Sequence, residues 1–488
     1  IDRKTGRERK LLTPGYHISA TTSVGGDYLV WSETEQDIRW SNRDYAEIRT
    51  YNFKTGKTRE LTHESRYFAP IISADGAGVA AVYVSPENEC SIDLLSVPSG
   101  CLIKRFPIPG HGQAITPNWS PDSKQIIFTL LTEKGETIAS MDTATGRVRC
   151  LMPWSFNEIN GPAYLYSHFI IYSTDDSDVE NIYAMDTLTK AAFRITSARF
   201  AAFDPDFTPD KKKMIYSDYT SDGLMVVETD LDPSRWTPVT HADNHPVGLA
   251  DALTRQETAN IQDSVRLRNI FKMNTAGTCD LSKDTIIGKI FETRRYSRFL
   301  NLLNPHSWAP LSFDVNNLAV MPGVMLLSQN VLSTMFAAAG WEYDVNEQTG
   351  KFYASLSYKG WYPEFTLRFD IGNRAAFAVN KGGSGKSRFT WQETNLKAFM
   401  SIPFNFSHGK YSRYLQPSVG FTLTGVRHNS STPEKFTSGN IQSMDYSISA
   451  SQYLHRNQKD VYPRWGQDCN ITYRNTPFGG SDPGSVFG

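Results

Sequence analysis

The first residues that could do chemistry are Gly385, Lys386 and Ser387, within the stretch NKGGSGKSRF. They match the end of the phosphate-binding pattern G-x-x-x-x-G-K-[ST], in which successive backbone N–H groups and a following helix bind phosphate. The pattern requires a glycine where this chain has Asn380. The residues after the loop are apolar at every second position, which predicts a strand and not a helix. We therefore expect a polar hairpin loop here, no nucleotide site, and no effect of Lys386→Ala.

Other catalytic and metal-binding patterns are missing from the sequence. It contains no G-x-S-x-G and no H-E-x-x-H, and its ten histidines are dispersed. His306 has no second ligand at helix or hairpin spacing. The five cysteines lack C-x-x-C spacing, so we interpret them as isolated buried thiols. The sequence thus predicts no catalytic, cofactor-binding or metal-binding residue and no cofactor, although it does not exclude an enzyme.

The composition of the chain limits the classes of protein to which it can belong. The net charge of −1 over 488 residues gives no electrostatic argument for nucleic acid or an anionic membrane surface. Aromatic residues make up 12% of the chain, which favours strands, either in a soluble β protein or with aromatic girdles at a lipid interface. No run of 18 apolar residues is present, so no membrane-spanning helix is expected.

The N-terminal half is repetitive, with a period of about 45 residues. One marker is a turn of the type Asp/Asn-x-x-Thr-Gly between two β-prone runs; its glycine is replaced once, by Lys190. A second marker is a proline that recurs with the same period. The turn glycines are Gly6, Gly56, Gly100 and Gly146, and the prolines are Pro70, Pro117, Pro162 and Pro205. Four short strands per repeat predict the blades of a β-propeller.

The aspartates that recur with these repeats are better explained by structure than by catalysis. Asp and Asn side chains accept hydrogen bonds from backbone N–H groups two residues later, which favours them in turns. We expect this role for Asp122, Asp142, Asp186 and Asp210.

The repeat resembles a known family. PNWSPDSKQIIFT followed by IASMDTATGRVRCL is similar to the TolB-like, WD-repeat-like propeller blade. The resemblance covers residues 1–240, loosest where Trp119 becomes Phe207 and where Lys190 replaces the glycine. It implies a six-bladed-type propeller, incomplete at the N-terminus: five full blades plus the end of a sixth at residues 1–13. Such a disc is expected to bind a partner on its surface.

Residues 241–318 are expected to connect two domains. The first part is polar, with partial helical character. The part from Arg294 to Asp314 is too apolar for a free linker, because it contains Tyr296, Phe299 and Trp308. We expect it to form a plug or collar at the mouth of the next domain, with a buried connector as the alternative.

Residues 319–488 change to longer strands that alternate in polarity. Phe365, Leu367, Phe369 and Ile371 fall on one face of a strand, and Thr366, Arg368 and Asp370 on the other. Strands near ten residues with short and long loops in turn are typical of an outer-membrane β-barrel. Tyr358, Trp361 and Tyr362 at a strand end fit an aromatic girdle. A soluble β-sandwich is the alternative.

This half also resembles outer-membrane barrels of the bacterial surface-antigen type that carry a periplasmic propeller, as in Bacteroidetes-like envelopes. The similar residues are HSWAPL, GVMLLSQNVLST, YDVNEQTGKFYASLSYKGWYP and FGGSDPGSVFG. In such relatives a peptidase-like domain precedes the propeller, and nothing of it is found here. About eight strands are expected before Gly488, which would leave the barrel incomplete at its C-terminus.

Together these patterns predict an all-β chain, a propeller followed by an antiparallel barrel. The expected function is that of an outer-membrane protein whose periplasmic propeller binds a protein or envelope ligand, in envelope assembly, transport or scaffolding. Its expected partners are outer-membrane lipid and a protein at the propeller face, with no nucleic acid. The alternative is the regulatory half of an envelope peptidase or hydrolase with a soluble second domain.

Overall fold

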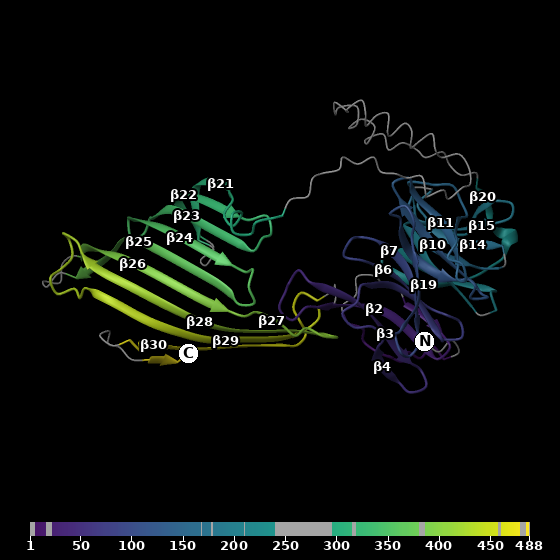
Figure 1. Ribbon diagram of the computed structural model, residues 1–488, viewed down its shortest axis with the longest axis horizontal. Helices are drawn as coiled ribbons and strands as arrows, with labels where there is room; N and C mark the ends of the chain where they lie inside the picture. Colours follow the sequence, from purple (N-terminus) through teal and green to yellow (C-terminus); the bar gives the residue numbers. More distant parts are fainter. Residues whose placement is uncertain are drawn as a thin grey trace, which may run out of the picture. The chain divides into compact units, whose positions relative to one another are not determined.

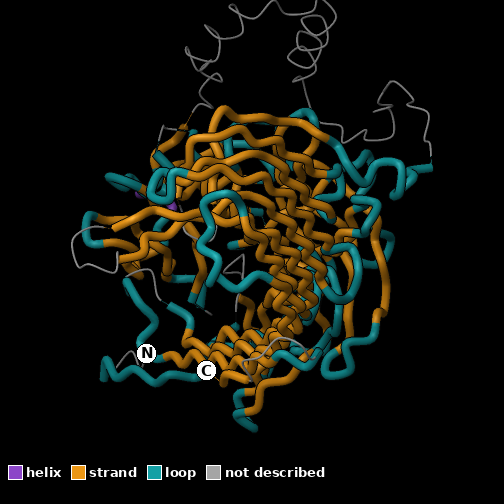
Figure 2. Tube along the Cα trace, turned by 90° about the vertical axis from the view of Figure 1, so that its left-hand side faces the viewer, coloured by secondary structure: helices purple, strands orange, loops and turns teal. Residues whose placement is uncertain are grey.

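The structure is a computed structural model that describes residues 5–15, 22–166, 168–176, 179–208, 210–239, 295–314, 319–379, 386–456, 460–478 and 485–487. Strands dominate these residues, and the one helix among them is the short 3-10 helix η1 (Pro233–Arg235) (Figure 2). The chain divides into two units. The first unit comprises residues 1–35 and 44–289, and the second comprises residues 36–43 and 290–488.

The first unit contains four antiparallel sheets that are each built on four consecutive strands, which we number as blades 1 to 4 in chain order (purple to teal in Figure 1). Blade 1 is β1 (Thr22–Gly25), β2 (Tyr28–Gln36), β3 (Asp44–Asn52) and β4 (Lys57–Glu60). Blade 2 is β5 (Tyr67–Ile72), β6 (Gly78–Val84), β7 (Cys90–Ser96) and β8 (Leu102–Pro107). Blade 3 is β9 (Gln113–Trp119), β10 (Gln125–Thr132), β11 (Gly135–Asp142) and β12 (Val148–Cys150). Blade 4 is β13 (Ile159–Tyr164), β14 (Phe169–Thr174), β15 (Asn181–Asp186) and β16 (Ala192–Arg194).

Blade 5 departs from this plan. It consists of β17 (Ala201–Phe207), β18 (Lys213–Thr220) and β19 (Gly223–Asp230). The repeat predicts a fourth strand ending near residue 240, and β20 (Thr237–Val239) does form there, but it pairs with β16 of blade 4. The cause is local: Asp232 caps η1 where blades 1 to 4 have a tight turn with a positive-φ residue, namely Gly56, Gly100, Gly146 or Lys190, so the chain does not fold straight back onto β19.

The two sequence markers correspond to backbone features. Asp142 accepts hydrogen bonds from the N–H groups of Ala144 and Thr145 at 3.1 and 2.7 Å, and Gly146 has φ +76°. The proline marker sits at a β-bulge in the innermost strand, where the residue before the proline has positive φ. These preceding residues are Ala69, Thr116, Gly161 and Asp204.

Apolar side chains are buried between successive blades. The innermost strands β1, β5, β9, β13 and β17 lie next to one another in chain order, as in a propeller. Ile126, Phe128 and Met141 of blade 3 are fully buried against blade 2, whereas Ile127 and Ile138 point to the other side and pack against blade 4. The indole N–H of Trp119 in blade 3 donates a hydrogen bond to the carbonyl of Ile71 in blade 2 at 3.2 Å.

The part of the predicted sixth blade that the structure describes, residues 5–13, contains no strand. Gly6 nevertheless has φ +66°, the value found at Gly56 in blade 1, so the turn marker is present here also. Five blades are thus found, four of them with four strands, and the prediction of five complete four-stranded blades is wrong for the last.

The second unit contains a single antiparallel sheet, sheet F, with the strands in chain order (green to yellow in Figure 1). Its strands are β21 (Pro305–Asp314), β22 (Ala319–Gln329), β23 (Met335–Asp344), β24 (Thr349–Tyr358), β25 (Glu364–Val379), β26 (Lys386–Ser401), β27 (Phe404–Asn405), β28 (Tyr411–His428), β29 (Gly439–Leu454), β30 (Gly466–Asn475) and β31 (Ser485–Phe487). A large antiparallel sheet therefore follows the propeller, and nine of its eleven strands are longer than any strand of the blades.

Part of the predicted connecting segment differs from expectation. Residues 305–314, expected as a plug or collar, form β21 at the edge of sheet F. Pro305 and Pro310 obscured this strand in the sequence, since prolines interrupt the ladder and the register shifts between Ala309 and Leu311. Phe299 is 83% exposed and does not pack as expected. Most of the remaining connector, residues 240–294, lies outside the described residues.

The cysteines are not all isolated buried thiols. Cys90 is buried and free, but Cys101 and Cys469 are free and exposed, and Cys150 is disulfide-bonded. A pairing of this kind has no spacing signal, because the two cysteines of a disulfide can lie far apart in sequence.

Candidate functional site

Apolar and polar residues alternate along the strands of sheet F, which gives the sheet one apolar face and one polar face. The register places Phe365, Leu367, Phe369 and Ile371 of β25 opposite apolar residues of β24, for example Leu356 and Phe352. The same face continues through β26, β28, β29 and β30. Its members there include Leu396, Met400, Val419, Phe421, Leu423, Met444, Tyr446, Ile448, Ile471 and Tyr473.

This apolar face is exposed. Phe352 is 63% exposed, Leu367 45% and Ile448 51%. On β21 to β23, Trp308, Val324 and Trp341 extend the same face and are also exposed. Monomeric soluble proteins rarely expose contiguous apolar patches beyond a few hundred Å². A face that crosses nine neighbouring strands therefore marks a surface that contacts something apolar.

The opposite face of sheet F is polar and carries ion pairs. Lys351 Nζ lies 2.8 Å from Glu342 Oε1, and Ser312 Oγ donates to Glu342 Oε2 at 2.9 Å. Asn395 Nδ2 donates to Asp370 Oδ2 at 2.9 Å, and Arg474 pairs with Asp445. Asp370 and Asp445 are each only 9% exposed. Charges at these positions are stabilised by partners on neighbouring strands, as buried polar groups require.

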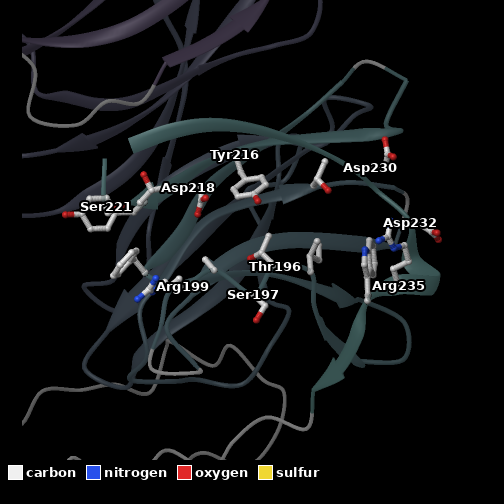
Figure 3. A pocket seen from close by; sticks show the side chains of 16 residues that line it. Thr196, Ser197, Arg199, Tyr216, Asp218, Ser221, Asp230, Asp232 and Arg235 are labelled. Carbon is white, nitrogen blue, oxygen red and sulfur yellow. The ribbon is translucent and has the colours of Figure 1, made fainter. Parts of the chain in front are cut away.

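The first unit contains a pocket of about 590 Å³ at the junction of blades 4 and 5 (Figure 3). Residues 195–200, which follow blade 4, form one wall, and β18, β19 and η1 form the other. The pocket exists where the outer strand of blade 5 has crossed to blade 4, which leaves β19 without an outer neighbour among the described strands.

The pocket lining combines aromatic rings with charges of both signs. Tyr219 and Phe200 meet edge to face at 6.3 Å, and the Arg199 guanidinium lies 5.3 Å from the Phe200 ring centre. Burial, with the neighbouring charge of Asp218, raises the pKa of Tyr216. Arg199 and Arg235 lie at opposite sides of the lining (Figure 3). No His, Cys or Lys side chain is among the described residues of the lining.

The aspartates singled out from the sequence have the predicted turn roles. Asp122 accepts from Ser120 Oγ at 2.6 Å and from the N–H of Lys124 at 3.1 Å, and these bonds lower its pKa. Asp210 does the same with Thr208 and Lys212. Asp186 accepts from the N–H of Leu188 at 2.8 Å. Asp122 and Asp142 belong to blade 3, Asp186 to blade 4 and Asp210 to blade 5.

The strand that follows the phosphate-loop pattern argues against a phosphate site. Lys386 is the first residue of β26 and is paired with Val379 of β25, so a strand stands where a phosphate site needs a helix. The loop residues 380–385 themselves lie outside the described residues. His306 is exposed, and its Nδ1 lies 2.6 Å from Ser307 Oγ.

One group of possible metal ligands occurs among the described residues, and sequence spacing did not reveal it. Glu47, Glu60 and His63 of blade 1 place ligand atoms within 4.8 Å of one another. Arg49 already lies between the two carboxylates, 3.0 Å from Glu47 and 3.1 Å from Glu60. The guanidinium supplies the positive charge that a metal would bring, so we interpret this group as an ion-pair network.

Comparisons with known proteins give fold neighbours only. No protein-family profile and no curated protein matches the chain. Among solved structures, TolB from Acinetobacter baumannii is 17% identical, covering 44% of this chain and 54% of its own, with a TM-score of 0.35. A protein assigned as TolB from Agrobacterium tumefaciens is 18% identical, covering 45% and 79%, also at 0.35. The β-propeller domain of the Trilobed protease from Pyrococcus furiosus is 10% identical, covering 78% and 93%, at 0.31.

TolB-like propellers are thus among the structural neighbours of the first unit, and this chain spans about half the length of one of them. Scores this low do not support an argument on function. The propeller arrangement rests on the strand pairing itself. In the described part of the chain, no helix has the length and apolar character needed to span a bilayer.

Proposed function

We propose that this chain is an outer-membrane protein whose sheet F contacts lipid through its apolar face and whose propeller binds a protein partner on the periplasmic side. The observation that carries the proposal is the exposed apolar face across nine strands of sheet F, with the ion pairs confined to the opposite face. Transmembrane strands have this division, because lipid-facing and lumen-facing residues alternate.

The alternative, a soluble sandwich, explains less well why apolar side chains of sheet F are exposed. In a sandwich the apolar faces of two sheets pack together and become the core. Here the described strands of the second unit all belong to one sheet, and Phe352, Leu367 and Ile448 remain exposed. At about 25 cal/mol per Å², leaving such a face in water would cost many kcal/mol relative to contact with acyl chains.

The propeller part of the proposal is supported by rigidity and by surface chemistry. Consecutive blades share fully buried cores, so loops and pockets at the blade ends are held in place. The pocket between blades 4 and 5 is lined by Tyr, Phe, Trp and Arg side chains, which are the types enriched at protein-binding surfaces.

The test is the solution behaviour of the whole chain with and without detergent. We expect a monodisperse species in a mild non-ionic detergent, aggregation when the detergent is removed, and recovery in lipid vesicles, from which alkaline carbonate does not extract the protein. A chain that stays monodisperse in plain buffer, with sheet F folded by near-UV circular dichroism, would remove the membrane part of the proposal.

A further inference from the structure

The outer edge of blade 5 is formed by β19, and no described strand covers it. In blades 1 to 4 the third strand is paired with a fourth, but β20, which should complete blade 5, pairs with β16. β19 itself pairs with β18 along all eight of its residues, without a shift of register. It is therefore a regular edge strand of eight residues.

The register shows which backbone groups of β19 point away from β18. The N–H of Leu231 donates to the carbonyl of Lys212 at 2.9 Å, and the ladder continues from the adjacent pair, Asp230 and Lys213. Successive residues of an antiparallel strand direct their N–H and C=O groups to opposite sides. The residues that direct these groups outward are therefore Leu224, Val226, Glu228 and Asp230. No other described residue hydrogen-bonds to the N–H or C=O group of Leu224 or Val226.

The sequence of β19 does not protect this edge. Proteins usually protect an exposed edge strand with charged side chains, above all Lys, or with Pro. The outermost strands of blades 1 to 4 follow this rule, with the sequences KTRE in β4, LIKRFP in β8, VRC in β12 and TPV in β20. β19 instead begins with GLMVV, in which Leu224 is 63% exposed and Val226 is 81% exposed. A long apolar edge of this kind favours pairing with another strand.

The second half of β19 is acidic, which limits the kind of strand that can pair with it. Lys213 Nζ of β18 lies 2.6 Å from Glu228 Oε1 and 4.0 Å from Asp230 Oδ1, and the Asp230 side chain is still 72% exposed. Like charges on paired strands destabilise the pair, and opposite charges stabilise it. A second copy of β19 would add its own Glu228 and Asp230 to the ladder. A strand with Lys or Arg at this end would complement them.

We propose that an extended segment of a partner protein adds to the outer edge of β19 as the fourth strand of blade 5. Its apolar residues lie opposite Leu224 and Val226, and its Lys or Arg residues lie opposite Glu228 and Asp230. In this mode of recognition the main-chain hydrogen bonds supply affinity and the alternate side chains supply specificity. This names the partner class for the propeller part of the proposed function, on which it rests, and it is independent of the membrane part.

The experiment uses the full chain in non-ionic detergent and the fluorescent, end-capped peptide KTKTVTVT. Antiparallel to β19, this peptide places its lysines opposite Asp230 and Glu228 and its valines opposite Val226 and Leu224. Binding is measured by fluorescence anisotropy, and we expect the peptide to bind.

Two matched peptides test the backbone pairing. One carries an N-methyl group on its fifth residue, whose N–H faces β19, and the other on its fourth residue, whose N–H faces away. We expect the first to raise Kd at least about tenfold and the second to change Kd less than about twofold, because only the first loses a hydrogen bond to β19. A peptide with glutamate in place of both lysines should bind several-fold more weakly, most clearly at low salt.

Two variants of the protein test the same edge. Val226→Pro removes an N–H that points away from β18, and Pro is tolerated at such a position of an edge strand, so the unfolding midpoint should stay close to that of the parent protein. The variant should raise Kd for the Lys peptide at least about tenfold, because one main-chain donor is lost and the ring obstructs the added strand. Val226→Thr keeps the N–H and the β-branched side chain and should change Kd less than about threefold.

Four results would overturn the proposal. These are no binding of the Lys peptide, equal loss with both N-methyl peptides, equal binding of the Lys and Glu peptides, or a dimer of the chain in detergent that Val226→Pro abolishes, which would show that a second copy covers β19. If Val226→Pro does not fold, the N-methyl peptides still decide whether β19 pairs.

The vesicle assay separates this claim from the membrane part of the proposed function. If the Lys peptide fails to bind but the protein still inserts into lipid, only the partner class is lost. If the peptide binds but the chain needs no detergent, only the membrane part is lost.

Discussion

The two units bury opposite kinds of side chain. In the blades, Ile126, Ile138 and Ile170 are fully buried between sheets. In sheet F the buried side chains are polar, such as Glu342 and Asp370, and Met335 is the one buried hydrophobic residue among those described. Both units are made of antiparallel strands, so secondary structure does not cause the difference. This difference is what the proposed function requires, with the apolar face of sheet F against lipid and the propeller in water.

The sequence pattern follows the same division. A middle strand of a blade is covered on both faces, and β10 accordingly reads QIIFTLLT, an almost continuous apolar run. A strand of sheet F has one apolar and one polar face, and β25 accordingly alternates from Phe365 to Ile371. Strands of the two units therefore differ in the spacing of their apolar residues along the sequence, more than in the number of those residues.

The largest effect is expected from a charge on the apolar face of sheet F. Leu367→Arg places a guanidinium where lipid is expected, at a cost of about 2–4 kcal/mol near the bilayer midplane. We expect loss of folding into vesicles, measured by the heat-modifiable shift on gels. Leu188→Arg, at an exposed turn of blade 4, is the matched control and should assemble normally. Normal assembly of Leu367→Arg would contradict the assignment of this face to lipid.

The second effect concerns the propeller core. Ile127 is fully buried between blades 3 and 4, and Ile127→Ala should cost about 2–5 kcal/mol of unfolding free energy. The measurement is urea unfolding of the propeller followed by tryptophan fluorescence. Ile448→Ala, on the exposed face of sheet F, removes the same atoms without a core cavity. If both variants lose equal stability, the two faces are not in different environments.

The third effect is a loss of stability at alkaline pH through Tyr67. Burial raises its pKa to about 12, helped by the charge of Asp93, to which its hydroxyl donates at 3.0 Å. The folded protein therefore holds this proton more tightly than the unfolded chain. The stabilisation, about 3 kcal/mol, is complete below pH 10 and is lost as the pH rises through 12.

This prediction is checked by unfolding between pH 9 and 12, with Tyr67→Phe as the comparison. Tyr67→Phe should lose this component of the alkaline slope. An identical slope in both proteins would show that Tyr67 does not titrate abnormally.

The smallest effect is expected at the phosphate-loop pattern. Lys386→Ala changes the first residue of a strand, so assembly, stability and the absence of nucleotide binding should all be unchanged. Isothermal titration with ATP and Mg²⁺ is the measurement. Heat of binding that disappears with this variant would show a nucleotide site that the strand after the loop argues against.

Much of the fold could be predicted from the sequence because its repeats and alternation are local signals. The turn aspartates, the blade period and the polarity of β25 all depend on neighbouring residues. The pairing of β20 with β16 could not be predicted, since a three-residue strand has no signal for its partner. β21 was hidden by Pro305 and Pro310. The pocket between blades 4 and 5 and the group of Glu47, Glu60 and His63 depend on tertiary structure alone.

The central claim is that one face of sheet F contacts lipid, and the most direct measurement is labelling from within the bilayer. Single cysteines are introduced at positions 367 and 368 of a chain that lacks its native free cysteines. Each protein is then placed in vesicles that contain a lipid-borne, thiol-reactive probe. The account predicts strong labelling at Leu367→Cys and little at Arg368→Cys, because the two side chains lie on opposite faces of β25. Equal labelling, or protection of position 367 alone, would contradict it.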